Sequence, residues 1–485
     1  MIKIKNLILN KIHIIFLLIG LCIYCYSIIL SLGTLFPGNL GDGLWTNYVL
    51  EHGFLFLQNT VNHKSFWDMP FYFPHTNTLA YSDFMLGAII VYIPIRTIIK
   101  DPFYALHAWF ILTCILNYYS MYYLLHKIFN FNKIPSSIGS LVFAFSLLRY
   151  TNMGNYQFQT QFYMILSFIA FFKINKNCSK IRNNICFLFG TIFFIIQLYT
   201  SFYLAWYMVY GLAIFILIAI FSPNIRIEFL SFIKTYRYEI ILYSIITMIL
   251  SVTLIKHYLA VETEFDYYGN ERLIKFVDFI YSNNIIENHI FHSIYKDSER
   301  FIINPDNSVC MGYITFILFS IGLILTKKYR IQILFFFIIS FSFFVSENLN
   351  ILLYRVFPGA SAIRFGFRLV FILLPVISYY IANLFEHLQK KKILSTVILI
   401  LMLIELVPTS GNFESSKISI NEYLSNVHIP NNCNIYFADV DFYSNVQYMF
   451  QTNYIPLYTI NGYSGHKVAF DTRYIPEKCV VKNNK

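Results

Sequence analysis

The sequence predicts an all-α polytopic membrane protein with about 11–12 membrane helices. Three observations support this fold class. Hydrophobic residues make up 57% of the 485 residues and charged residues only 13%, whereas a soluble globular chain carries about 25% charged residues. Apolar runs of roughly 17–22 residues recur along the chain, as membrane helices require. Lys and Arg collect in short clusters between these runs, which is the pattern of the positive-inside rule.

The same clusters account for the net charge of +11. Basic residues that alternate with apolar runs orient a chain in a membrane, whereas a nucleic-acid site would gather them on one segment. We therefore expect membrane lipids as partners of this chain, and no nucleic acid.

The first apolar run, at 13–33, follows Lys3, Lys5 and Lys11. It is longer than the core of a signal peptide, and no small-residue cleavage site follows it. We expect a retained first helix with a cytoplasmic N-terminus. The polar stretch that follows, 34–82, is then the first outer loop.

Two apolar runs, 84–99 and 103–125, are joined by the basic turn Arg96–Lys100. We expect both runs to cross the membrane and the turn to be cytoplasmic. The next run, 137–150, is short and is followed by a polar stretch. A second crossing here would place the basic residues after Lys173 on the outer side. We therefore expect 137–150 to be a broken element that enters from the outer side and returns to it, covered by protein.

The later spans follow a regular pattern, and each strong basic cluster falls on the cytoplasmic side. The run 184–221 is too long for one helix and is expected to break at Gln197–Ser201. The other expected spans are 239–256, 309–326, 331–346, 369–386 and 393–407. A second large outer loop occupies 257–308.

The composition becomes polar after Pro408. We divide the chain into a membrane domain, 1–407, and a small extracytoplasmic C-terminal region, 408–485, of α/β type. Alternating segments such as NIYFADVDF predict strands there. The region is too short for a robust core of its own, so we expect it to pack on the membrane domain and on 257–308. Cys433 and Cys479 lie outside, where an oxidising compartment would let them form a disulfide.

Two aspartates stand at the ends of the first outer loop. Asp42 lies between two glycines, and Asp83 precedes the next apolar run. Either aspartate suits a helix N-cap. Either also suits a catalytic role, because an ionisable residue at the mouth of a membrane helix is a functional candidate. His75 and His52 lie in the same loop; His75 is included as a substrate-binding candidate, although a solvent-facing position suits both histidines.

Three arginines are expected on the outer side, where they do not serve the positive-inside rule: Arg149, Arg364 and Arg368. A guanidinium group matches phosphate oxygens in geometry, so a phosphorylated lipid would explain them, as would lipid headgroups or acidic neighbours. Gln157, Gln161 and Tyr203 offer hydrogen bonds to a sugar or to buried neighbours.

The sequence contains no P-loop, no GxGxxG after a strand, no GxSxG and no HExxH, which disfavours ATP-driven and cytosolic nucleotide chemistry. No CxxC pair or His/Cys spacing indicates a zinc site. We expect no organic cofactor, and dependence on a divalent cation is left open.

Several segments are similar to one large bacterial group. They are GDGLW, YFPHTNTLAYSDFMLG, IGSLVFAFSLLRYTNMGNYQFQTQFY, QLYTSFYLAWY, FPGASAIRFGFRLVF and NGYSGHK. In this order they resemble the GT-C glycosyltransferases, polytopic membrane enzymes that use polyprenyl-phosphate sugars. The resemblance covers nearly the whole chain, but each motif is short.

The resemblance implies a role for each matched residue. Asp42 would be the catalytic acid/base and Asp83 a second carboxylate of the site, while Arg149, Arg364 and Arg368 would contact the lipid phosphate. It also implies a bacterial inner-membrane enzyme with an extracytoplasmic C-terminus. Such an enzyme moves a monosaccharide from a polyprenyl-phosphate donor to a glycan or lipid acceptor on the outer face.

Three alternatives remain. An O-antigen polymerase or ligase concentrates Arg and His in a late loop, whereas here the candidate loop follows the first helix. A lipid-linked glycan transporter would carry charges within its spans and an inverted repeat. A non-catalytic relative would keep the scaffold alone; the sequence FSLLR lacks the Pro-Tyr that often precedes this arginine in the family, and no His precedes the Gln-bearing segment.

Overall fold

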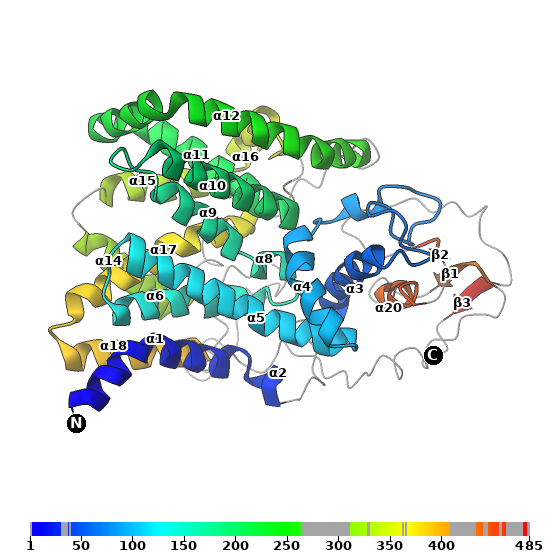
Figure 1. Ribbon diagram of the computed structural model, residues 1–485, viewed down its shortest axis with the longest axis horizontal. Coiled ribbons are helices and arrows are strands. Elements are labelled where there is room, and N and C mark those ends of the chain that lie inside the picture. The colour runs from blue at the N-terminus through cyan, green and yellow to red at the C-terminus, as the bar shows by residue number, and fades with distance from the viewer. Residues whose placement is uncertain are drawn as a thin grey trace.

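The computed structural model describes residues 2–30, 37, 40–262, 311–326, 330–360, 363, 366–407, 433–439, 445–454, 458–461 and 479–482. The described chain is mostly helical, with a small sheet near the C-terminus (Figure 1). Two parts are visible: a large helical bundle, and a smaller lobe at one end of it that contains α3, α4, α20 and the strands.

The bundle helices are α1 (Ile2–Tyr24), α2 (Tyr26–Leu30), α5 (Pro102–Tyr123), α6 (Lys133–Phe145), α7 (Leu147–Thr151), α8 (Tyr156–Gln159), α9 (Phe162–Phe172), α10 (Lys180–Thr200), α11 (Phe202–Phe221), α12 (Pro223–Glu262), α14 (Tyr313–Leu325), α15 (Arg330–Val345), α16 (Glu347–Val356), α17 (Val370–Leu388) and α18 (Lys392–Glu405). The lobe contains α3 (Leu40–Leu57), α4 (Leu86–Ile98), α20 (Asn445–Gln451), β1 (Ile435–Asp439), β2 (Tyr458–Thr459) and β3 (Val480–Lys482).

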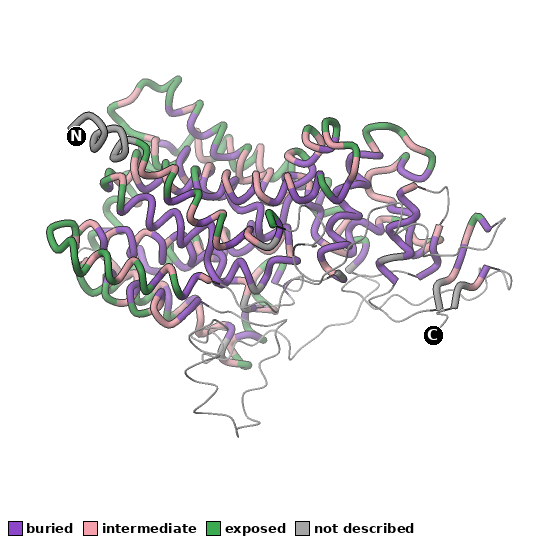
Figure 2. Tube along the Cα trace, turned by 90° about the horizontal axis from the view of Figure 1, so that it is seen from below, coloured by how far each residue is buried: buried purple, intermediate pink, exposed green. Residues whose placement is uncertain are grey.

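Five described helices are long and apolar enough to cross a membrane, and a sixth span results if α15 and α16, which are bent by 91°, count together. Buried residues fill the centre of the bundle and continue into the lobe (Figure 2). The break expected at Gln197–Ser201 is confirmed, since α10 ends at Thr200 and α11 begins at Phe202.

The bundle has two distinct ends. We call the end that carries the lobe the lobe end and the opposite one the far end. At the far end, the side chain of Lys173, after α9, donates to the Tyr123 hydroxyl at the end of α5 (2.8 Å). The backbone N of Asn132, before α6, donates to Glu386 near the end of α17 (2.9 Å). Helix α6 therefore begins at the far end, and helix α9 ends there.

This placement corrects the expected course of 137–150. The element is broken, as predicted, but it does not start at the end of the bundle that carries the first loop. Helix α6 starts at the far end and runs to the end of α1, where the Tyr24 ring contacts the Phe145 ring at 5.8 Å between centroids. The chain then turns through α7 and α8 and returns along α9. The two arms form a hairpin whose tip lies at the lobe end.

The expected crossing at 84–99 is also wrong. Helix α4 belongs to the lobe: Arg96 in its last turn is buried and donates to Glu51 of α3, with Nε at 2.6 Å from the carboxylate. The ring of Phe103, at the start of α5, stacks on Phe450 of α20 at 5.5 Å. The turn 96–100 therefore lies at the lobe end. Helix α4 thus stays at the lobe end, whereas α6 runs along the bundle, so the two differences from the expected course offset each other at the start of α10.

The first loop and the C-terminal segment build the lobe together. Strand β1 pairs in parallel with β2 on one side and β3 on the other. Strand β2 also joins the first loop, because Phe73 N donates to the Thr459 carbonyl (2.9 Å) and Thr459 N donates to the Pro70 carbonyl (3.2 Å). The C-terminal segment thus packs on the first loop; the expected contact with 257–308 lies outside the described residues.

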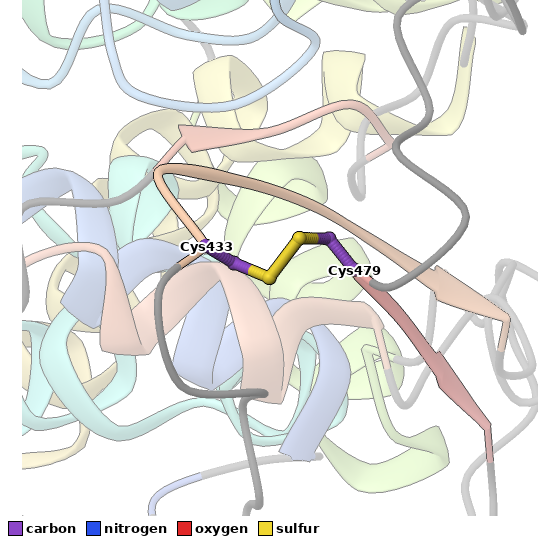
Figure 3. The surroundings of a disulfide bond; sticks show 2 residues. All are labelled: Cys433 and Cys479. Atoms are coloured by element: carbon purple, nitrogen blue, oxygen red, sulfur yellow. A yellow bond between two sulfur atoms is a disulfide. The ribbon is translucent and has the colours of Figure 1, made fainter.

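A disulfide joins Cys433, before β1, to Cys479, before β3 (Figure 3). The predicted pairing is therefore present in the structure. The two cysteines are separated by 46 residues, so the bond closes a long loop within the lobe.

Replacing Cys433 and Cys479 with serine is expected to destabilise the strand region by roughly 2–4 kcal/mol, because the open chain gains conformational freedom when unfolded. Limited proteolysis should then cut the C-terminal segment faster, with the bundle unaffected. Replacing Cys22 and Cys178, which are free thiols of the bundle, provides the control. Equal cleavage rates in both variants would show that the disulfide does not hold the lobe.

Candidate functional site

Asp83 lies at a junction of elements that are distant in sequence. Its side chain is buried, with 7% exposed. The carboxylate accepts a hydrogen bond from Phe202 N (2.9 Å), the first backbone N–H of α11, and one from the Ser201 hydroxyl (3.5 Å). Asp83 therefore caps α11 from outside that helix. This differs from the predicted cap of α4, whose N-cap position is Met85, without a side-chain hydrogen bond.

Gln157, from α8, and Arg368, from the short 3-10 helix Gly366–Leu369, complete the surroundings of Asp83. Burial raises the pKa of Asp83 to about 6, while the charge of Arg368 and a hydrogen bond from Gln157 act in the opposite direction. The Gln157 side chain is itself buried, and its Oε1 atom has no hydrogen-bond partner among the described residues.

Arg368 is half-buried between aromatic rings. Its guanidinium carbon lies 4.4 Å from the centre of the Tyr203 ring and 4.6 Å from that of Phe158. Cation–π contacts of this kind hold an arginine in place without neutralising it. The turn that carries Arg368 is fixed to α11, because the Tyr207 hydroxyl donates to the Gly366 carbonyl (3.1 Å).

Asp42 lies in the first turn of α3 and is half-buried. The helix begins at Leu40, so Asp42 is not the N-cap that the sequence suggested. Trp45, one turn further along α3, donates from Nε1 to the Ser82 hydroxyl (3.3 Å). Because Ser82 precedes Asp83, the start of α3 and the Asp83 segment lie next to each other. The structure thus brings the neighbourhoods of both loop aspartates together.

Arg149 does not join this cluster. Its side chain is fully buried, and its Nε donates to the Phe143 carbonyl (2.6 Å). Its terminal nitrogens donate to the Phe158 carbonyl (3.0 Å) and to the Gln161 side chain (2.6 Å). Gln161 in turn donates to the Phe371 carbonyl. The three nitrogens of Arg149 thus donate to the turn between α6 and α9. The lipid-phosphate contact that the resemblance implies for Arg149 stays a prediction.

The remaining candidates lie elsewhere. His75 is half-buried in a turn, where its backbone N donates to the Tyr72 carbonyl (2.8 Å). That turn is next to β2, on the side of the lobe made by the C-terminal segment. Arg364 lies outside the described residues. Among the residues that the structure describes, no group of three or more His, Cys, Asp or Glu side chains could hold a metal ion.

Sequence reasoning missed the contribution of α12. The Tyr258 hydroxyl donates to the Ser82 carbonyl, and the Tyr258 ring stacks on Phe202 at 6.1 Å. The preceding residue, His257, stacks on Trp67 of the first loop at 3.7 Å. No local pattern indicates these contacts, because α12 continues as a helix beyond its apolar run and reaches the loop only through tertiary packing.

Replacing Asp83 with asparagine is expected to remove a pH dependence of stability. Between pH 6 and 4 the native carboxyl, with its pKa raised to about 6 from 3.8, binds a proton that the unfolded chain does not. Wild-type stability relative to the variant should therefore increase as the pH falls through about 6 and should be lowest at higher pH. Thermal unfolding at pH 5 and pH 8 tests this. If wild type and variant differed in stability by the same amount at pH 5 and at pH 8, the prediction would be contradicted.

No protein-family model matches the chain, and no curated protein matches it significantly. A solved structure, the oligosaccharyltransferase of Archaeoglobus fulgidus in the apo form, is similar with a TM-score of 0.48 and 10% sequence identity. The match covers 94% of this chain and 64% of that protein, so the chain spans less than two thirds of its length.

Proposed function

We propose that this protein is a membrane glycosyltransferase. In this proposal it moves a monosaccharide from a polyprenyl-phosphate donor to a glycan or lipid acceptor of the cell envelope, on the outer face of a bacterial inner membrane. The N-terminus is then cytoplasmic, and the lobe is extracytoplasmic.

The observation that carries the proposal is the meeting of candidate residues around Asp83. Gln157, Tyr203 and Arg368 were singled out from separate parts of the sequence, and all three lie at one junction with this aspartate. The junction is at the lobe end of the bundle, beside the start of α3, which carries Asp42. The junction combines a cation, Arg368, with the carboxylate of Asp83 and the amide of Gln157, and Asp42 adds a second carboxylate nearby. Such groups suit the transfer of a sugar from a phosphate.

The chemistry assigns different tasks to the two aspartates. Asp42, the less enclosed of the two, is proposed as the general base that accepts the proton of an acceptor hydroxyl. The freed oxygen then bonds to the anomeric carbon of the donor sugar, while the bond from that carbon to the phosphate oxygen breaks. The electron pair leaves on the lipid phosphate, which gains a negative charge.

Arg368 is proposed to stabilise this leaving phosphate, because a guanidinium group binds phosphate oxygens through paired N–H donors. Asp83 is more enclosed than Asp42, and we propose it as a positioning residue that caps α11 next to Arg368. Gln157 and Tyr203 offer polar atoms to the sugar. No residue role in this scheme depends on a metal ion.

The test is deletion of the gene, mass-spectrometric profiling of surface glycans, and complementation with single variants. Asp42→Asn is expected to lower product formation by about 10²–10⁴-fold, the usual contribution of a general base. Glu347→Gln, at an exposed carboxylate at the start of α16, is the matched control and should restore the glycan.

Full restoration by Asp42→Asn would exclude Asp42 as the base. If Arg368→Gln restored the glycan as well, the non-catalytic alternative would be favoured over the transferase. An unchanged glycan profile after deletion would overturn the proposal as a whole, provided that the protein is expressed in the cells that are compared.

A further inference from the structure

Two histidines of the first loop face each other inside the lobe. His52 lies on α3 and His63 lies in the loop that follows, and their Nδ1 atoms are 2.7 Å apart. Their side chains are 0% and 1% exposed, respectively. The sequence suggested a solvent-facing position for His52, and that prediction is wrong.

The hydrogen bonds fix the protons of this pair. His52 Nε2 lies 3.0 Å from the Phe66 carbonyl, which can only accept, so this nitrogen carries a proton. A neutral His52 then has a bare Nδ1, and the proton between the rings belongs to His63. The Nε2 atom of His63 is consequently bare; it is buried and has no hydrogen-bond partner among the described residues.

The C-terminal segment covers this pair. The Tyr48 hydroxyl of α3, one turn before His52, is 2.9 Å from the Thr452 hydroxyl, and Asn62 donates to the Thr452 carbonyl at 3.3 Å. The Thr452 backbone would also accept a hydrogen bond from a protonated His63, and its effect on the His63 pKa is opposite to that of burial and smaller. Thr452 therefore packs against His63, and both imidazoles are buried while the C-terminal segment is in place.

The charged groups around the pair do not offset the free-energy cost of burying a protonated imidazole. Asp68 raises the pKa of His52, but its effect is smaller than that of burial. Glu51, next to His52 on α3, is bound to Arg96 and to the hydroxyls of Tyr92 and Tyr454. Lys64, beside His63, is exposed. Burial consequently lowers the pKa of His52 to about 4 and that of His63 to about 3.

We propose that His52 and His63 form a proton-sensitive latch that holds the C-terminal segment on the first loop while both imidazoles are neutral and releases it in mild acid. The proposal is independent of the transferase function.

The direction of the pH dependence follows from which state, latched or released, binds more protons. The released state exposes two histidines with an ordinary pKa of 6.5, so it gains protons below that pH, whereas the latched state does not until about pH 4. The free energy that favours the latched state is therefore largest above pH 6.5 and decreases as the pH falls through that value. At pH 5 the equilibrium shifts by roughly thirty-fold for each histidine that gains a proton.

Hydrogen–deuterium exchange of the full-length protein in detergent tests the latch, with rates corrected for the intrinsic effect of pH. From pH 7.5 to 5, protection should fall in α20 and in the second half of α3, while α5 and α17 stay protected. The double variant His52→Gln/His63→Gln should lose this pH dependence. His126→Gln, at the far end of the bundle, should keep it.

A second measurement uses the wild-type protein alone. Met449 of α20 is 1% exposed, so its oxidation by hydroxyl radicals should increase as the pH falls from 6.5 to 5, by about tenfold per pH unit for each proton bound. Unchanged oxidation would overturn the latch even if the double variant failed to fold. Equal acid sensitivity in the double variant would show that other groups drive the release.

Discussion

Replacing Glu51 with alanine is expected to destabilise the lobe by about 3–5 kcal/mol, because it leaves a buried arginine without its partner. Arg96 Nε and NH2 donate to the Glu51 carboxylate at 2.6 and 3.3 Å. The carboxylate is fully buried, and it also accepts from the hydroxyls of Tyr92 and Tyr454. One side chain thus connects α3, α4 and the C-terminal segment.

The double variant Glu51→Leu/Arg96→Met is the informative control. It removes both charges, and replacing a buried ion pair by apolar side chains is often neutral or stabilising. We expect the double variant to recover most of the stability that Glu51→Ala loses. Thermal unfolding, followed by size-exclusion chromatography, measures this recovery. If the double variant were as unstable as Glu51→Ala, the loss would come from the hydrogen bonds to the tyrosines and not from the unpaired arginine.

Replacing Arg149 with methionine is expected to cost roughly 3–5 kcal/mol, since each buried carbonyl that loses its donor costs about 1–3 kcal/mol. The carbonyls of Phe143 and Phe158 would both lose a charged donor. The hairpin between α6 and α9 would then lose the contact that closes its tip. Thermal unfolding of the purified variant measures this effect.

Arg368→Gln is the matched comparison, because this arginine is half-buried and is held by ring contacts. We expect a small change in stability and a large loss of glycan product. The opposite result for Arg149→Met, normal stability with no product, would indicate that Arg149 contacts the substrate as the resemblance implies.

The sequence was informative where one local property decides the structure. The break between α10 and α11 follows from a polar stretch in an apolar run that is too long for one helix. The predicted spans 239–256 and 369–386, read from apolar runs between basic clusters, fall on described helices that are long and apolar enough to cross a membrane. The pairing of Cys433 with Cys479 was also anticipated, because both cysteines lie in the polar C-terminal segment.

The prediction failed for α4 and α6 because hydropathy does not distinguish lipid from protein surroundings. Helix α4 packs on α3 of the lobe and on α5 and α10 of the bundle. Its basic residue, Arg96, pairs with Glu51, 45 residues earlier in the chain. Helix α6 is rich in Ser and Gly, which lowers its hydropathy. Its Ser137 and Ser140 hydroxyls donate to backbone carbonyls one turn earlier, so they are satisfied within the helix.

For the candidate site, too, some features could be predicted from the sequence and others could not. The chemical type of Asp83, Arg368, Gln157 and Tyr203 could be recognised from the sequence, and the structure places them together. Two outcomes could not be foreseen: that Asp83 caps α11, and that Arg149 is enclosed by the carbonyls of its own turn. Both depend on which backbone groups are left without a partner, and that is decided only by tertiary packing.

The lobe is built from two segments that lie far apart in the sequence, and this affects when it can fold during synthesis. Tyr454, which donates to Glu51 at 3.0 Å, follows it by 403 residues. At a synthesis rate of about 5–20 residues per second, this interval corresponds to roughly 20–80 s. During that time Glu51, Arg96 and the two facing histidines lack their cover, while the bundle helices emerge one after another. The lobe is therefore the last part of the protein to become complete, and any factor that protects it must act until the C-terminal segment arrives.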